Sequence, residues 1–196
     1  MGFRVSWIAR AGTSTTELLE VSRRSLTGER HEFPDVGWYL LELTHGRDAS
    51  WVLLIADGSE NYADLDASLA QDLSNGGNEV LFFWCSDTVM ATELECFKGG
   101  AMAWAIRYDC EDSSKRPEMQ GKVPAVAHEI LAELRAEQQA DTEGGCDYDI
   151  TAELGRRLTG FRHDRDLETD DEQPFQVLSE PLKPRPSPAW WQFWKR

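Results

Sequence analysis

Glu79-Val80-Leu81-Phe82-Phe83-Trp84-Cys85 is the least polar stretch of the chain, and the rest of the sequence can be organised around it. Its six consecutive apolar residues are too few for an independent helix, and their aromatic content is typical of a strand. The run shows no polar alternation. We therefore expect both of its faces to be covered and the strand to lie in the interior of a sheet.

Two alternating runs follow this stretch and predict a hairpin. Residues 88–97 and 101–108 alternate with the period of two that marks strands. Lys98-Gly99-Gly100 lies between them, and glycine can supply the positive φ that a tight turn needs. The sequence thus predicts three consecutive strands over 79–108 as the centre of the core.

The residues before this block predict alternating strands and helices. Strands are expected at 3–9, 37–43 and 51–56, with helices at 14–24 and 63–74. Up to Cys85 the order is β-α-β-β-α-β, which is that of a ferredoxin-like unit. The predicted fold class is α+β, with a mostly antiparallel sheet that the hairpin extends and helices packed on one face.

Two further helices are predicted after the hairpin. Pro124 begins one of them, and the other covers 150–159 and ends at Gly160. We expect one domain over residues 1–165 and a flexible tail over 166–196. The tail is first acidic, then rich in proline, and its last seven residues hold an aromatic cluster.

Charge and cysteine spacing exclude several classes of function. The net charge of −15 argues against a nucleic-acid partner, because phosphates require a basic face. It suits a basic protein partner that is reached by electrostatic steering. The four cysteines include no CxxC pair, and we expect neither a metal nor another cofactor. The absence of a signal segment and of an apolar stretch of ~20 residues predicts a cytoplasmic protein without a membrane span.

The candidate catalytic residues have a simpler structural explanation. Cys85-Ser86-Asp87 could act with His128 as a nucleophile, an orienting group and a base. However, Cys85 ends a buried strand, and His128 lies opposite the apolar stripe of its helix. The alternating acids between Asp164 and Asp170 also lack the glycine and glutamate of a calcium loop. We therefore expect no enzyme, and keep an enzyme of unrecognised type that involves Cys85, His128 or His163 as an alternative.

Four short segments together carry a resemblance: Phe3-Arg4-Val5-Ser6-Trp7, Gly37-Trp38-Tyr39-Leu40, Asp147-Tyr148-Asp149 and Leu158-Thr159-Gly160-Phe161-Arg162-His163-Asp164. On these segments, and over roughly residues 1–165, the chain resembles a family of small acidic bacterial proteins of unknown function. That family has no assigned activity, cofactor or catalytic residue, so the resemblance implies none for this chain.

These observations predict a non-enzymatic protein that binds another protein. The most concrete form is an acidic immunity-type inhibitor that neutralises a bacterial toxin or effector. An adaptor or regulatory scaffold that uses the Trp-rich tail is the main alternative; the tail itself could fold onto its own domain, enter a partner's groove or touch a membrane. The residues predicted to bind the partner are Asp35, Glu42, Asp57, Glu60, Asp64, Asp66, Trp190, Trp191 and Trp194.

Overall fold

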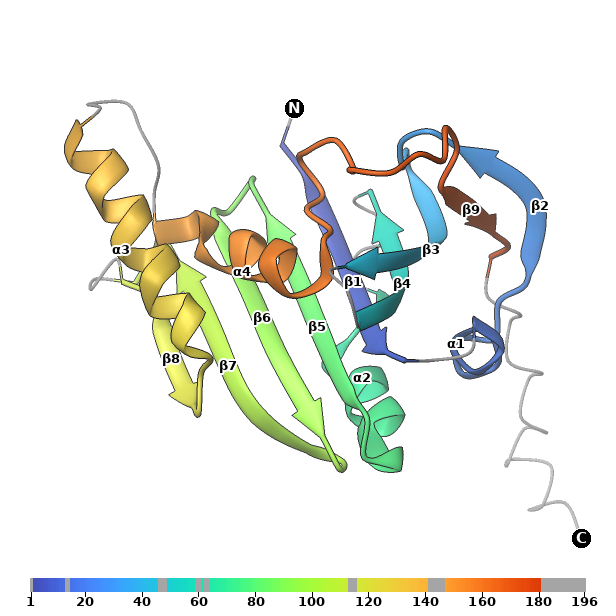
Figure 1. Cartoon of the computed structure of the whole chain (residues 1–196), viewed down its shortest axis with the longest axis horizontal. Coiled ribbons are helices and arrows are strands. Elements are labelled where there is room, and N and C mark those ends of the chain that lie inside the picture. Colours follow the sequence, from blue (N-terminus) through green and yellow to red (C-terminus); the bar gives the residue numbers. More distant parts are fainter. Residues whose placement is uncertain are drawn as a thin grey trace, which may run out of the picture.

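A computed structural model describes residues 2–12, 15–45, 49–58, 61, 64–112, 116–140 and 147–180. Within these residues a nine-stranded sheet runs through the molecule in the order β2-β9-β3-β4-β1-β5-β6-β7-β8 (Figure 1). Every neighbouring pair of strands is antiparallel. The strands are β1 (Arg4–Ala11), β2 (Leu26–His31), β3 (Gly37–His45), β4 (Ala49–Asp57), β5 (Glu79–Ser86), β6 (Ala91–Lys98), β7 (Ala101–Asp109), β8 (Glu118–Gly121) and β9 (Phe175–Leu178).

Four α-helices accompany the sheet in the described residues: α1 (Thr15–Ser22), α2 (Ala67–Leu73), α3 (Ala125–Ala140) and α4 (Ile150–Thr159). Two short 3₁₀ turns, η2 (Ser74–Gly76) and η3 (Asp147–Asp149), follow α2 and precede α4. None of the helices in the part of the chain described here has the length and apolar character needed to cross a membrane.

The apolar stretch that opens the core is the interior strand β5. It lies between β1 and β6, and the side chains of Leu81 and Phe83 are completely buried. The predicted hairpin is also present, because β6 and β7 are joined at Gly99 and Gly100, whose φ angles are 61° and 76°. Two successive positive φ angles match the right-handed twist of the flanking strands. The prediction of three consecutive strands is therefore confirmed.

The expected fold class, α+β with an antiparallel sheet, is confirmed. The sheet contains the order β3-β4-β1-β5, so the first strand lies between the third and fourth strands of the predicted βαββαβ unit. Leu18 of α1 and Ala70 and Leu73 of α2 pack in the same hydrophobic cluster, on one face of these strands. The hairpin then extends this unit, as the alternating runs predict.

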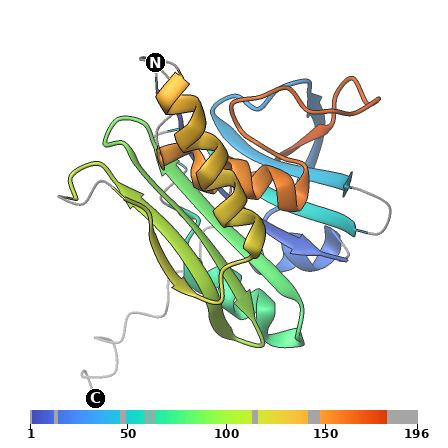
Figure 2. The same ribbon diagram turned by 60° about the vertical axis from the view of Figure 1, so that its left-hand side comes forward.

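The expectation that all helices lie on one face is wrong, because α3 and α4 cover the opposite face (Figures 1 and 2). The reason lies in β5, which is apolar on both sides. Val80 and Phe82 pack in the cluster beneath α1 and α2, whereas Leu81 and Phe83 pack beneath α3 and α4. Helices on one face alone would leave the second set of side chains exposed to water.

The predicted domain boundary at residue 165 also needs correction. Strand β9 lies between β2 and β3 in the sheet, and its residues Phe175 and Leu178 are 2% and 5% exposed. The acidic run before β9 is therefore a loop within the domain rather than the start of a tail. Strands β2 and β8 lie outside the predicted strands because they are short and mostly polar, and β9 lies in the expected tail because its four residues stand between acidic and proline-rich segments. Residues 181–196 lie outside the described residues.

Candidate functional site

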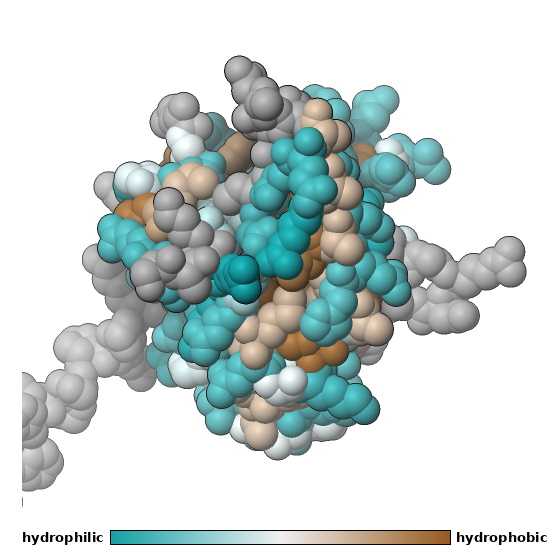
Figure 3. All heavy atoms as spheres, turned by 90° about the vertical axis from the view of Figure 1, so that its left-hand side faces the viewer, coloured by the Kyte–Doolittle hydropathy of each residue, from teal (hydrophilic) through white to brown (hydrophobic). Residues whose placement is uncertain are grey.

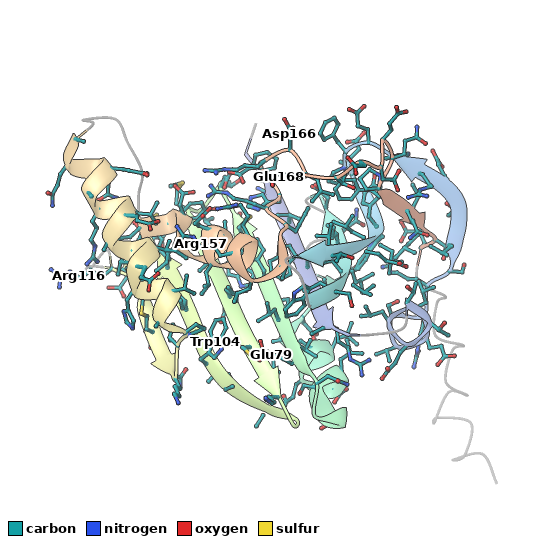
Figure 4. All side chains as sticks on the ribbon, in the orientation of Figure 1. Glu79, Trp104, Arg116, Arg157, Asp166 and Glu168 are labelled. Atoms are coloured by element: carbon teal, nitrogen blue, oxygen red, sulfur yellow. The ribbon has the colours of Figure 1, made fainter. Side chains whose placement is uncertain are left out.

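The candidate site lies at one end of the sheet, which we call the Phe3 end. There β1, β3 and β6 begin, and β4 and β5 end. The loop that leaves α4 crosses this end, at the top of Figure 1, and carries Asp166 and Glu168 (Figure 4). Three cavities of about 400, 330 and 260 Å³ share residues of this loop as their wall.

The end of α4 places the loop. Gly160 has a φ of 87°, which only glycine adopts easily, and its N–H donates to the carbonyl of Arg156 at 2.8 Å. The chain then turns so that Phe161 is buried, with its ring 6.3 Å from that of Trp7. This anchor directs the next three residues, Arg162-His163-Asp164, along the Phe3 end.

Arg162 is the centre of a group of paired charges. Its buried guanidinium donates to both carboxylate oxygens of Asp164, at 2.6 and 2.9 Å, and to Asp149 at 2.9 Å. A longer contact of 3.5 Å joins it to Glu153. Burial lowers the pKa of Arg162, but the surrounding carboxylates outweigh that effect and raise it. Arg162 therefore has its donors engaged by the protein itself.

Glu153 extends this group along α4. Its carboxylate accepts hydrogen bonds from Arg156 at 2.7 Å and from Arg157 at 3.3 Å. Burial opposes its ionisation, yet the two arginine hydrogen bonds prevail and lower its pKa to about 2. Glu153 and Arg157 are four residues apart, so their pairing is the i, i+4 contact that helical spacing favours.

A thiol and an imidazole meet in the 330 Å³ cavity, which we call the thiol cavity. The Sγ of Cys85 lies 3.4 Å from the Nε2 of His163, and Phe3 and Phe83 form part of the wall. Burial raises the pKa of Cys85 to about 12 and lowers the pKa of His163 to about 4. The pair is therefore a neutral thiol beside a neutral imidazole at pH 7, whereas an activated cysteine requires a thiolate.

The second ring nitrogen of His163 supports this description. Nδ1 is buried and has no hydrogen-bond partner within the described residues. An unsatisfied acceptor is tolerated better than an unsatisfied donor, so we assign the proton to Nε2, which faces Cys85. His128, the candidate base considered for Cys85, is exposed on α3, as its position opposite the apolar stripe predicts, and Asp87 accepts from the hydroxyl of Tyr148 at 2.7 Å.

The 260 Å³ cavity, which we call the Asp57 cavity, combines aromatic walls with a half-buried carboxylate. Phe3, Phe33 and Phe161 line it together with Asp57. Burial raises the pKa of Asp57 to about 6; a hydrogen bond from the backbone N–H of Gly58 opposes this increase, and the negative charge of Asp35 adds to it. Asp57 has no ion-pair partner among the residues that the structure describes, in contrast with the carboxylates around Arg162.

Exposed apolar side chains gather around these cavities. Seven large apolar side chains are exposed in the described part of the chain: Phe3, Val21, Leu26, Phe33, Val36, Val89 and Met90. Five of them, all except Val21 and Leu26, lie at the Phe3 end. Phe33 and Val36 are the most exposed, at 53% and 68%. By contrast, hydrophilic side chains dominate the side of the molecule formed by α3 and β8, with hydrophobic ones in a narrow strip (Figure 3).

The structure divides the acidic residues that the sequence predicts as partner-binding. Asp35 and Asp57 lie together at the Phe3 end. Glu42, Asp64 and Asp66 lie elsewhere: Glu42 accepts from Thr15 of α1, Asp64 lies near Arg24, and Asp66 caps α2 by accepting from Ser68 at 2.9 Å and Leu69 at 3.2 Å. Glu60, Trp190, Trp191 and Trp194 are outside the described residues.

Sequence reasoning misses the apolar part of this site. Phe33-Pro34-Asp35-Val36 reads as a polar loop, although it carries two large apolar residues that no predicted strand or helix would bury. That mismatch is the signal that could have identified the site. The chain also holds no group of three His, Cys, Asp or Glu residues within the described ranges that could bind a metal ion.

A comparison of the chain with protein-family models, curated proteins and solved structures finds no match. The resemblance to a family of small acidic bacterial proteins therefore stays a prediction. The function has to be argued from the site itself.

Proposed function

We propose that the protein is a non-enzymatic cytoplasmic binding protein that docks its Phe3 end onto the basic face of a protein partner. The observation that carries this proposal is that five of the seven exposed large apolar side chains lie at this end, beside the unpaired carboxylate of Asp57. Contiguous exposed apolar groups on a protein surface commonly mark an interaction site.

The composition of the Phe3 end supports a protein rather than a small-molecule partner. Exposed aromatic side chains and the carboxylates of Asp57 and Asp166 line the same cavity there, and interfaces between proteins commonly combine apolar and polar groups in this way. The net charge of −15 would accelerate encounter with a basic partner. The most concrete form of the proposal is an immunity-type inhibitor, whose acidic face covers the basic active site of a bacterial toxin.

A pull-down from the native host at low salt tests the proposal, with the full-length protein as bait. We expect Phe33→Ala to reduce capture of the partner about tenfold or more, because truncating an exposed aromatic anchor commonly costs more than ~1.4 kcal/mol of binding. Val21→Ala is the matched control, since Val21 is exposed on α1 away from the Phe3 end, and it should bind normally. Recovery of no protein partner at low salt, or equal loss in both variants, would contradict the proposal.

Two further measurements separate the alternatives. An adaptor that uses its tail loses the partner when residues 181–196 are deleted, whereas the proposed binding by the Phe3 end survives the deletion.

A thiol enzyme requires a reactive cysteine, and the raised pKa of Cys85 argues against that mechanism. Peptide mapping after treatment of the folded protein with iodoacetamide at pH 8 should find Cys85 unmodified. Rapid modification of Cys85 would favour the enzyme instead.

A further inference from the structure

We infer that the Asp57 cavity is a seat for a single arginine side chain carried by the protein partner. This inference rests on the proposed function, because it names the group by which a basic partner would be anchored at the Phe3 end. It is carried by two independent features of the cavity, its uncompensated charge and its exposed aromatic walls.

The first feature is the state of Asp57. It lies at the end of β4, half-buried, and Asp35 adds a second negative charge nearby. The position of Asp35 is fixed, since its N–H donates to the hydroxyl of Tyr39 at 3.0 Å. Two arginines also line the cavity, but Arg162 is bonded to its own carboxylates, and neither it nor Arg165 forms an ion pair with Asp57 in the described residues. A cation from outside would supply the missing partner.

The second feature is the aromatic wall. Phe3 and Phe33 line the cavity while remaining 42% and 53% exposed, and Phe161 and Phe175 form its buried base. Exposed rings beside a carboxylate are suited to a cation that is partly desolvated, because the ring face attracts positive charge. Neither feature depends on the other, and both favour the same ligand.

The size and geometry favour a guanidinium group. The volume of about 260 Å³ lies below the ~300–1,000 Å³ of pockets that enclose whole small-molecule ligands, so one side chain fits better than a cofactor. Guanidinium is planar, and it can bond a carboxylate with two donors while stacking on an aromatic ring. The ammonium group of lysine cannot do both.

The test uses N-acetyl-arginine-amide as a probe of the isolated full-length protein, followed by amide chemical shifts in two-dimensional NMR. We expect saturable shifts at Phe3, Phe33 and Gly58, with N-acetyl-citrulline-amide binding about tenfold or more weakly, because citrulline keeps the shape but loses the charge. Asp57→Asn should weaken arginine binding to a similar degree. Asp64→Asn removes one charge on the other side of the sheet and should leave binding unchanged.

Each other outcome overturns the inference. Equal shifts with arginine and citrulline would mean that no cation is recognised, and shifts that survive Asp57→Asn would place binding elsewhere. If Asp57→Asn alters the signals of residues 181–196 in the protein without probe, the chain's own basic tail fills the cavity. The NMR titration needs no partner protein, so its result is independent of the pull-down. The titration can show no arginine binding although the pull-down recovers a partner, and the reverse is equally possible.

Discussion

Two kinds of carboxylate lie near the Phe3 end, on α4 and the loop that leaves it and at the end of β4, and their electrostatic states are opposite. Glu153 and Asp164 are bonded to arginines, and those bonds lower their pKa values despite burial. Asp57 is half-buried without a cation, and its pKa is raised to about 6. Asp57 and Asp164 even line the same cavity.

The difference separates charges that hold the fold from a charge that is available for binding. A buried carboxylate with well-placed donors is compensated, and removing a donor leaves charge without a partner. An uncompensated carboxylate destabilises the free protein slightly and is stabilised when a cation arrives from outside. The comparison therefore predicts that neutralising substitutions within one small region change the free energy of unfolding in opposite directions.

The largest effect is expected for Arg162→Met, which keeps an unbranched side chain about as long as the aliphatic part of arginine but removes the guanidinium and its charge. Asp149, Glu153 and Asp164 would then lose the buried guanidinium that is their common donor. We expect the free energy of unfolding to fall by about 3–5 kcal/mol, measured by urea denaturation at pH 7. The matched control is Arg165→Met, because Arg165 is exposed and should change stability by less than ~0.5 kcal/mol. A similar loss of stability in both variants would mean that the charges paired with Arg162 do not hold the fold.

A smaller loss is expected for Glu153→Gln, because a neutral amide still accepts hydrogen bonds. We expect a decrease of about 2 kcal/mol in the free energy of unfolding at pH 7. The sign with pH follows from the lowered pKa: the contribution of Glu153 is complete above pH ~4.5 and is lost as the pH falls toward about 2. Between pH 2 and pH 6, the free energy of unfolding of the variant should therefore change less with pH than that of the wild type. Parallel profiles for variant and wild type would contradict the assigned role.

Asp57→Asn should act in the opposite direction. The pKa of Asp57 is higher in the folded protein, so its ionisation opposes folding as the pH rises through about 6. We expect the variant to be more stable than wild type by roughly 1 kcal/mol at pH 8, a modest value because the side chain is partly solvated. Below pH ~3 the difference should disappear, since aspartic acid, whose ordinary pKa is 3.8, is then neutral in both states. A variant that is less stable at pH 8 would show that Asp57 has an internal partner after all.

The framework of the fold could be predicted because its signal is local. The apolar stretch 79–85, the alternation of the next two strands and the glycine pair each identify their element without tertiary information. Strand β9 could not be predicted in this way, because Phe175-Gln176-Val177-Leu178 is too short and stands between acidic and proline-rich residues. Only its two strand neighbours, β2 and β3, make it part of the sheet.

In the candidate site, too, contacts between residues close in sequence could be predicted, whereas contacts between distant residues could not. The pairing of Glu153 with Arg157 could be predicted from helical spacing, and that of Arg162 with Asp164 from proximity in sequence. The approach of His163 to Cys85 spans 78 residues and depends on the turn at Gly160. Asp35 and Asp57 meet because the register of β3 and β4 places Gly37 opposite Asp57, which no local pattern specifies.

The smallest effect is expected at the outer edge of the paired group. Arg157, which lies on α4 in Figure 4, is also bonded to Glu133 of α3, and that carboxylate is 54% exposed. Solvent screens such a pair, so Glu133→Gln should lower the free energy of unfolding by no more than ~0.5 kcal/mol, whereas Glu153→Gln acts on the buried side of the same arginine. Glu137→Gln, one turn further along α3, is the matched control and should be neutral in urea denaturation. A loss at Glu133 as large as that at Glu153 would mean that burial does not decide which carboxylates hold the fold.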